Sequence, residues 1–320
     1  MPRKKIVVLG SYNTDMIVQV PRIPRPGETM LGGRFSMAAG GKGANQAVAA
    51  ARAGGRVQFI GRVGRDMFGD RAVASLGEEG IDASLVAIDP AEPSGTALIF
   101  VAESGENAIG VASGANARLL PNEVEHCREA LESADILLLQ LETPLDAVQA
   151  AARMAASATI ILNPAPAAQL PPDLLARVSV LTPNESEAEA LTGIEIRSDK
   201  DLMDAAAALL RCGPGTVLIT LGARGALLAR GEVREIVPGF HVEAIDSTAA
   251  GDVFNGVLAV ALAEGMEMRP AVTFAHAAAA LSVTRLGAQP SIPLRIEIDS
   301  FLSRQEESIH SGRPSAGKDE

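Results

Sequence analysis

Short apolar runs alternate with longer amphipathic stretches along most of the chain. Runs of four or five residues suit buried strands, and we predict strands at Ile6–Leu9, Val57–Gly61, Ile136–Gln140, Thr159–Asn163, Val178–Thr182 and Thr216–Thr220. Apolar residues at helical spacing predict helices at Gln46–Ala53, Phe68–Glu79, Pro144–Ala156, Glu185–Leu191, Lys200–Arg211, Ala250–Glu264 and Pro270–Thr284. This alternation indicates an α/β fold whose mostly parallel sheet is covered by helices on both faces.

Four further strands interrupt this alternation. Met16–Val20 and Thr29–Met37 are separated by prolines and a glycine, and Thr96–Val101 and Asn107–Val111 flank a turn at 104–106. We expect these strands to form a small sheet standing over the main one. The chain is polar from Ser303 to Glu320, so we expect this tail to be disordered.

Composition limits the partners of the chain. It has 320 residues, 47% of them hydrophobic, and a formal net charge of −11, which argues against nucleic acid as the main partner. No apolar run reaches the roughly 18 residues of a membrane span, and no secretory signal is visible. Cys127 and Cys212 form no CxxC pattern, which favours reduced thiols over a disulfide framework. We therefore expect a cytoplasmic protein.

The segment Asp246–Gly256 carries the strongest chemical signal. Turn-like residues run into apolar residues at helical spacing, which places Ala249, Ala250 and Gly251 at or near a helix N-terminus. Free N–H groups and the helix dipole suit such an end to a phosphate or a developing oxyanion. Asp252 adds a carboxylate where an acceptor hydroxyl needs a base, so the segment indicates phosphoryl transfer to an alcohol. The alternative is an aspartate that only stabilises the first helical turn.

A glycine-rich segment, Gly40–Asn45, precedes the first predicted helix. Three glycines in four residues allow a ligand to approach the backbone closely, although glycines at a helix start also serve tight packing. A Walker loop is excluded because Gly43 follows Lys42 where Ser or Thr is needed. Residues 10–15, after the first strand, lack the G-x-G-x-x-G fingerprint, which argues against a nicotinamide-dependent dehydrogenase.

Polar residues follow several predicted strands. They are Asn13 and Asp15 after the first strand, Glu142 after 136–140, Asn184 and Glu187 after 178–182, and the segment Thr220–Gly225. Because parallel strands end at the same edge of a sheet, these positions suggest one shared crevice. Taken singly, each is better explained as a cap or turn, and Asn184 with Glu187 could be a helix N-cap with its capping-box partner.

Together these segments resemble the ribokinase family of small-sugar and nucleoside kinases. The similarity runs from Ile6 to about Phe301 and includes Gly40–Asn45, Thr182–Glu185, Thr220–Gly222 and Asp246–Gly256. The resemblance implies one kinase domain over residues 1–302, built as a three-layer α/β/α sandwich with a β-sheet lid from about 12–38 and 95–112. It also implies ATP-dependent phosphorylation of the 5-hydroxyl of D-ribose, and a homodimer formed through the lid.

The resemblance also implies a role for each matching position. Asp252 would be the general base, and the backbone N–H groups of Ala249, Ala250 and Gly251 would stabilise the transferring phosphoryl group. The sugar positions are Asn13, Asp15, Gly41, Lys42, Gly43, Asn45 and Glu142. The nucleotide positions are Asn184, Thr220, Leu221, Gly222, Ala223, Arg224, Gly225, Gly251 and His276. Glu187 would support Mg²⁺ through bound water, and a K⁺ site would involve Asp246, Thr248, Ser282, Arg285, Gly287 and Ser291.

Alternatives stay open within and beyond the family. The acceptor could instead be 2-deoxyribose, a ketohexose or a nucleoside. The Asn13 amide can pair with a ring hydroxyl, which argues against deoxyribose, and only 3% of the residues are aromatic, which argues against a nucleoside. A non-catalytic sugar-binding regulator should have lost Asp252 or Gly251, and both are present.

Overall fold

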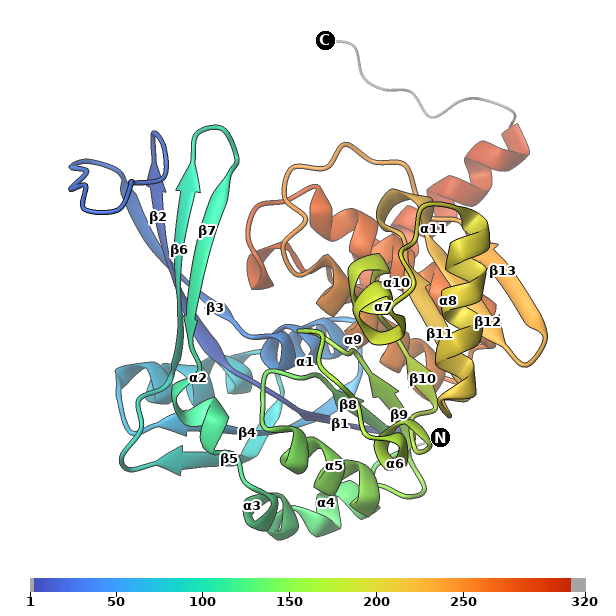
Figure 1. The fold of residues 1–320 in the computed structure, drawn as a ribbon, viewed down its shortest axis with the longest axis horizontal. Coiled ribbons are helices and arrows are strands. Elements are labelled where there is room, and N and C mark those ends of the chain that lie inside the picture. Colours follow the sequence, from blue (N-terminus) through green and yellow to red (C-terminus); the bar gives the residue numbers. More distant parts are fainter. Residues whose placement is uncertain (1–2, 312–320) are drawn as a thin grey trace.

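Two β-sheets organise the chain in the computed structural model, which describes residues 3–311 (Figure 1). The larger sheet has nine strands in the order β13-β12-β11-β10-β9-β8-β1-β4-β5. Its strands are β1 (Lys5–Leu9), β4 (Arg56–Gly64), β5 (Asp82–Asp89), β8 (Ile136–Leu139), β9 (Thr159–Leu162), β10 (Val180–Leu181), β11 (Thr216–Thr220), β12 (Ala226–Arg230) and β13 (Val233–Val237). Neighbours are parallel from β5 to β11, and β12 and β13 are added antiparallel at one edge.

Alternate residues of the buried strands face two separate cores. In β1, Ile6 and Val8 belong to one core, and Val7 and Leu9 belong to the other. The first core includes α1 (Lys42–Arg52), α2 (Met67–Glu78), α9 (Ala250–Ala263), α10 (Met268–Val283) and α11 (Arg295–Ser311). The second includes α3 (Pro121–His126), α4 (Arg128–Glu132), α5 (Leu145–Met154), α6 (Pro172–Leu175), α7 (Glu185–Thr192) and α8 (Asp199–Arg211). The three-layer α/β/α arrangement is therefore confirmed.

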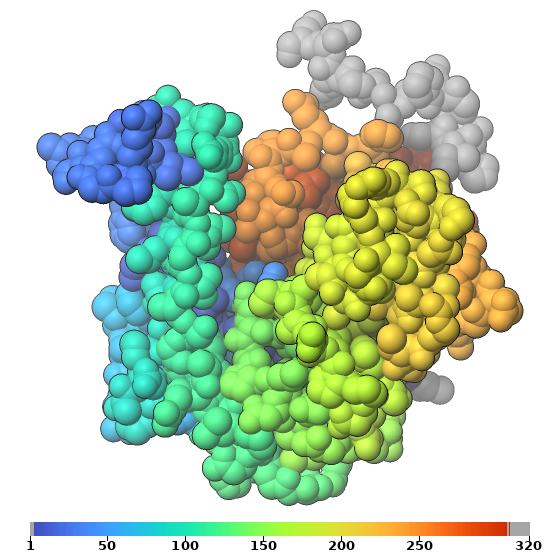
Figure 2. Space-filling model, viewed as in Figure 1, coloured from blue at the N-terminus to red at the C-terminus, as the bar shows by residue number. Residues whose placement is uncertain are grey.

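The smaller sheet stands away from the body, at the left of Figure 1. Its strands are β2 (Asn13–Val20), β3 (Arg34–Gly40), β6 (Gly95–Ala102) and β7 (Asn107–Ala112), in the order β3-β2-β6-β7. The pairs β2–β3 and β6–β7 are antiparallel, and β2 and β6 are parallel. The four strands that interrupt the α/β alternation thus form a sheet of their own. Figure 2 shows a hollow between this sheet and the C-terminal part of the body.

The C-terminal boundary differs from the expectation. Helix α11 continues to Ser311, so the segment expected to lose regular structure at Ser303 is helical as far as Ser311. Buried Ile298 and Phe301 anchor the helix to the first core, and charged residues beyond them have good helix propensity. Residues 312–320 lie outside the described part of the chain. None of the helices in residues 3–311 is long and apolar enough to span a membrane.

Candidate active site

Asp252 is a buried carboxylate in the first turn of α9. It is 5% exposed, and it accepts hydrogen bonds from Asn45 Nδ2 to Oδ2 (3.0 Å) and from Gln46 Nε2 to Oδ1 (3.1 Å). Burial raises the pKa of Asp252, whereas the charge of Lys42 and the two amide donors act in the opposite direction. A carboxylate held in this way is a stronger base than an exposed one and keeps a fixed orientation.

The backbone that precedes Asp252 forms the expected helix N-terminus. Ala249 is the N-cap of α9 and has φ 61°, the only positive φ outside glycine among the described residues. The N–H of Ala250 already donates to Ser247 O (3.2 Å), whereas no described hydrogen bond uses the N–H groups of Ala249 and Gly251. Of the three expected anion-hole donors, the N–H groups of Ala249 and Gly251 are therefore available to a ligand. The N–H of Ala250 would first have to give up its long hydrogen bond to Ser247.

A cavity of about 470 Å³ opens on the side of the small sheet. Its lining includes Asn13, Lys42, Val111, Asn116 and Glu142, and Val111 belongs to β7 of the small sheet. Several of its hydrogen-bonding groups face one another. Glu142 accepts hydrogen bonds from Ser11 Oγ (2.5 Å) and from the Lys42 N–H (2.9 Å).

Two acceptors near this cavity are poorly satisfied by the protein. Burial, with a smaller contribution from Glu142, raises the pKa of Asp15 to about 6. Oδ1 of Asn45 is buried and has no hydrogen-bond partner among the described residues. Buried polar atoms are nearly always paired, so these oxygens are suited to a ligand that brings hydroxyl donors.

The glycines at the start of α1 serve packing. A Cβ at Gly43 would lie 2.7 Å from the backbone of Gly10, and one at Gly41 would lie 2.8 Å from the Asn13 nitrogen. Gly41 also has φ +91°, which favours glycine. The tight-packing alternative therefore accounts for both residues, and they hold the start of α1 against the loop that carries Asn13.

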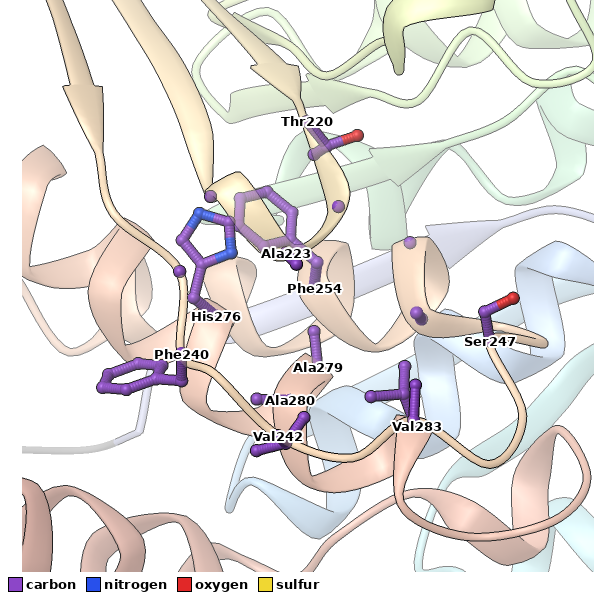
Figure 3. Close-up of a pocket in the computed structure, with 16 residues that line it drawn as sticks. Thr220, Ala223, Phe240, Val242, Ser247, Phe254, His276, Ala279, Ala280 and Val283 are labelled. Carbon is purple, nitrogen blue, oxygen red and sulfur yellow. The ribbon is translucent and has the colours of Figure 1, made fainter. Parts of the chain in front are cut away.

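A second cavity, of about 270 Å³, is lined by the first residues of α9 (Figure 3). Seven expected positions line it: Thr220, Gly222, Ala223, Gly225, Ala250, Gly251 and His276. The ring of His276 lies 4.9 Å from that of Phe254, and its buried Nε2 has no partner among the described residues. Burial lowers the pKa of His276 to about 4, so the ring is neutral at physiological pH.

Three residues expected on the nucleotide side have other contacts. Asn184 and Glu187 form the capping box of α7: Asn184 Oδ1 accepts from the Glu187 N–H (2.8 Å), and Glu187 Oε2 accepts from the Asn184 N–H (2.9 Å). Burial nevertheless raises the pKa of Glu187, and Lys42 and Asp252 lie close enough to affect it. Arg224 is paired with Glu185 and Asp199, at 2.8 and 3.1 Å, so its guanidinium is held at α7 and α8.

Three of the positions expected for a monovalent cation, Asp246, Thr248 and Gly287, are joined by hydrogen bonds. Asp246 accepts hydrogen bonds from the N–H groups of Thr248 (2.9 Å) and Gly287 (2.8 Å), which joins the two loops. Ser282 and Ser291 are buried, and Arg285 is paired with Glu297 at 2.5 Å. Residues 3–311 contain no group of three or more His, Cys, Asp or Glu side chains arranged for a metal ion.

Sequence reasoning missed several residues at these cavities. Ser11 orients Glu142, and Asn116 Nδ2 donates to Asn13 Oδ1 (2.8 Å). Phe240 and Val242 line the second cavity from the segment after β13. The alternation of apolar and polar residues at 240–244 was a usable signal for them, but nothing local marks Asn116 as a partner of Asn13.

A buried aspartate in the first turn of a helix fits a phosphotransferase that acts on a hydroxyl group. The start of that helix lines the second cavity, and Lys42, whose charge acts on the aspartate, lines the first. The first cavity includes the polar groups of Asn13, Lys42, Asn116 and Glu142, and the walls of the second are mostly apolar side chains. The comparisons agree: the chain belongs to the pfkB family of carbohydrate kinases, whose model matches residues 3–295.

Relatives and solved structures place the chain more closely in the ribokinase family. It is 46% identical to ribokinase of Haemophilus influenzae over an alignment of 302 residues. This alignment covers 94% of this chain and 99% of the relative. It is 35% identical over 304 residues to deoxyribokinase of Salmonella typhi, covering 94% and 99%. The structure of Arabidopsis thaliana ribokinase complexed with ribose and ATP is 32% identical, with a TM-score of 0.87 and coverage of 94% and 99%.

Proposed function

We propose that this protein transfers the terminal phosphoryl group of ATP to the 5-hydroxyl of D-ribose, giving D-ribose 5-phosphate and ADP. The observation that carries this proposal is the buried Asp252 at the start of α9, held by two amides of α1, the helix whose first residue, Lys42, lines the first cavity. The full-length similarity to ribokinases supports the choice of substrate.

The proposed reaction uses Asp252 as the base. The 5-hydroxyl proton passes to the carboxylate, the sugar oxygen bonds to the γ-phosphorus, and the bond from that phosphorus to the β–γ bridging oxygen breaks. Negative charge grows near the start of α9, where the N–H groups of Ala249 and Gly251 and the helix dipole stabilise it.

The sugar would occupy the cavity lined by Asn13, Lys42 and Glu142. Asp15 and Asn45 offer acceptors for its hydroxyls, because the first carries a raised pKa and Oδ1 of the second is unpaired among the described residues. Each buried polar group left without a partner costs about 1–3 kcal/mol, so the same groups discriminate against a sugar that lacks a hydroxyl.

The nucleotide would occupy the second cavity. Its apolar walls, which include Phe240, Val242 and Ala279, suit a flat base, and the N-terminus of α9 opens into the same cavity, where it suits the phosphates (Figure 3). The unpaired, neutral His276 Nε2 is a candidate for the base or the ribose of ATP.

Two ions belong to this proposal. Bound Mg²⁺ neutralises charge on the phosphates, and Glu187, whose carboxyl is close to Lys42 and Asp252, would hold it through water. For K⁺, the fit rests on Asp246: a carboxylate has about four acceptor sites, so two backbone N–H donors leave room for a cation. Oxygens of Thr248, Arg285 and Gly287, with those of Ser282 at the end of α10 and Ser291 in the turn 289–291, would complete that site.

We further infer a homodimer that forms through the small sheet, in the cytoplasm. Val111 lines the sugar cavity, so one face of the sheet points toward the body. The register places Phe35 and Phe100 beside Val18, and Leu98 lies on the same face of the sheet as Phe100. This face is opposite to the one that carries Val111. These three side chains are 60%, 37% and 56% exposed, an apolar surface that a second copy would cover. A Leu98→Lys variant should therefore sediment as a monomer.

The deoxyribokinase relative keeps 2-deoxyribose as the second candidate acceptor. The deciding experiment measures ADP release from Mg-ATP with D-ribose, 2-deoxyribose, fructose and adenosine, each with K⁺ and with a large organic cation. Turnover with ribose that requires K⁺ and disappears in Asp252→Asn is the expected result. Turnover only with another acceptor would refute the assignment of ribose as the substrate. Ribose binding without any turnover would favour a non-catalytic sugar-binding regulator.

A further inference from the structure

A layer of buried polar side chains lies beneath the first turn of α9. Gln140, Asn163 and Thr182 each directly follow one of three neighbouring parallel strands, β8, β9 and β10. Gln46 joins them from α1, and Asn255 joins them from α9. None of the five is more than 8% exposed, so this polar layer (Gln46, Gln140, Asn163, Thr182 and Asn255) is part of the interior.

Gln46 is held by three partners and fully buried, at 0% exposure. Its Nε2 donates to Asp252 Oδ1 (3.1 Å) and to Asn163 Oδ1 (3.3 Å). Its Oε1 accepts from Gln140 Nε2 (2.6 Å). Both donor hydrogens and the acceptor are therefore engaged, which fixes the amide and, through it, the Asp252 carboxylate.

The rest of the polar layer reaches the backbone carbonyl of Gly251, beside the proposed anion hole. Asn163 Nδ2 donates to Thr182 O (3.1 Å), and Thr182 Oγ1 donates to Asn255 Oδ1 (2.6 Å). Asn255 Nδ2 then donates to Gly251 O (2.8 Å). The base and the peptide that precedes it are thus supported by one connected set of hydrogen bonds, anchored at the ends of three strands.

The two oxygens of Asp252 face different surroundings. Oδ1 is bonded to Gln46, whose other partners are buried at the strand ends, so an acceptor cannot reach Oδ1 from that side. Oδ2 is bonded to Asn45, which lies three residues after Lys42 of the sugar cavity. Only Oδ2 is therefore placed for the acceptor hydroxyl.

We infer that Gln46 is a positioning residue for phosphoryl transfer: it holds Asp252 Oδ1 so that Oδ2 faces the acceptor, and the polar layer ties this orientation to the backbone carbonyl of Gly251. This inference rests on the proposed function. A purely structural role for the layer is the competing explanation, and it makes different predictions for pH dependence.

The test replaces Gln46 by methionine, which keeps the length of the side chain and removes its donors. We expect kcat with the sugar to fall about 10- to 100-fold, the usual range for losing a hydrogen bond to a charged group. KM for sugar and ATP should stay within about threefold, because neither substrate touches Gln46 in this arrangement. The acidic limb of the profile of kcat/KM against pH should move to higher pH, because the ionised form of Asp252 loses a hydrogen-bond donor.

Two further variants make the result decisive. Gln140→Met removes the donor one bond away from Gln46 and should change kcat in the same direction by a smaller factor. Gln58→Met is the matched control, because Gln58 Nε2 also donates to an aspartate, Asp82 Oδ2 (2.8 Å), near the opposite end of the parallel strands. It should leave kcat and the pH profile unchanged.

The possible outcomes separate the two explanations. A folded Gln46→Met protein with wild-type kcat and pH profile would overturn the inference, as would a kcat loss with no displacement of the acidic limb. If Gln46→Met does not fold, Gln140→Met decides by the same two criteria. Failure of the proposed function is distinct, because the wild-type protein itself would then phosphorylate no sugar.

Discussion

We expect the ionised Asp15 side chain to lower the folding stability of the sugar-free protein, because its carboxylate is placed for binding a sugar. Burial and the nearby Glu142 raise its pKa from 3.8 to about 6, and no described hydrogen bond offsets this. An acid with a raised pKa in the folded state binds its proton more tightly there, so its contribution is favourable at low pH and is lost as pH rises through 6. Asp15→Asn should remove that loss.

The magnitude follows from the two pKa values. A difference of about 2 units corresponds to about 3 kcal/mol above pH 7 and to about 1 kcal/mol at pH 4.5. Both values are upper limits, because Asp15 is only half-buried and solvent screens its charge. The free energy of unfolding of Asp15→Asn should therefore exceed that of the wild type by a margin that grows between pH 4.5 and pH 7.

The assay is urea unfolding of both proteins at pH 4.5, 6 and 8, without sugar. Asp89→Asn is the control of opposite sign, because N–H groups of Glu92 and Ala91, with Arg62, hold the pKa of Asp89 well below its usual range. That variant should lose stability at pH 8. A margin for Asp15→Asn that is equal at all three pH values, or a loss of stability at pH 8, would refute the reasoning. In the kinase assay, Asp15→Asn should raise KM for the sugar about tenfold or more, since it loses hydrogen bonds to a charged acceptor.

Three further predictions concern the anion hole and its neighbours. His276→Leu should raise KM for ATP about two- to tenfold in steady-state kinetics, and KM for ATP in the wild type should not titrate between pH 5.5 and 8, because the pKa of His276 is about 4. Gly43→Ala should lower the thermal midpoint, with a cost of about 1–3 kcal/mol or more, because its Cβ would lie 2.7 Å from backbone atoms of Gly10 and Ser11; an unchanged midpoint would contradict this. Ala249→Gly should keep wild-type kcat, whereas Ala249→Val should lower it, because a β-branched residue at φ 61° costs roughly 1–2 kcal/mol; equal kcat in the two variants would count against a left-handed N-cap in the working enzyme.

The layers of the fold could be predicted because their signals are local. The run Ile6–Leu9 is apolar on every residue, as a strand buried on both faces must be, and Asp246–Gly256 marks a helix start by its own residues. Strand β5 was missed because its residues are mostly half-buried and its sequence is mixed. The antiparallel pair β12–β13 was missed because the α/β alternation does not predict antiparallel strands added at the edge of the sheet.

The site divides along the same line. Asp252 and Glu142 could be proposed from the sequence because each lies in or next to a segment with its own signal. Gln46 looks like any polar residue of an alanine-rich helix, and its role depends on residues 206 positions away in the chain. Asn116 likewise meets Asn13 across 103 positions. Contacts between distant segments have no local signature, so they appear only once the chain is folded.

The small sheet has a mechanical consequence for the sugar site. β2 begins at Asn13, β3 ends at Gly40 immediately before α1, and β6 begins at Gly95 opposite Asn13 in the register. All three strands are thus attached beside the cavity proposed for the sugar, so the sheet has the geometry of a lever whose pivot lies at the proposed binding residues. When such a lever rotates as a rigid body, displacement grows with distance from the pivot. A rotation of this kind would move its far end across the hollow with little displacement of Asn13 and Lys42, and substrate entry would then be separate from the alignment of the reacting groups.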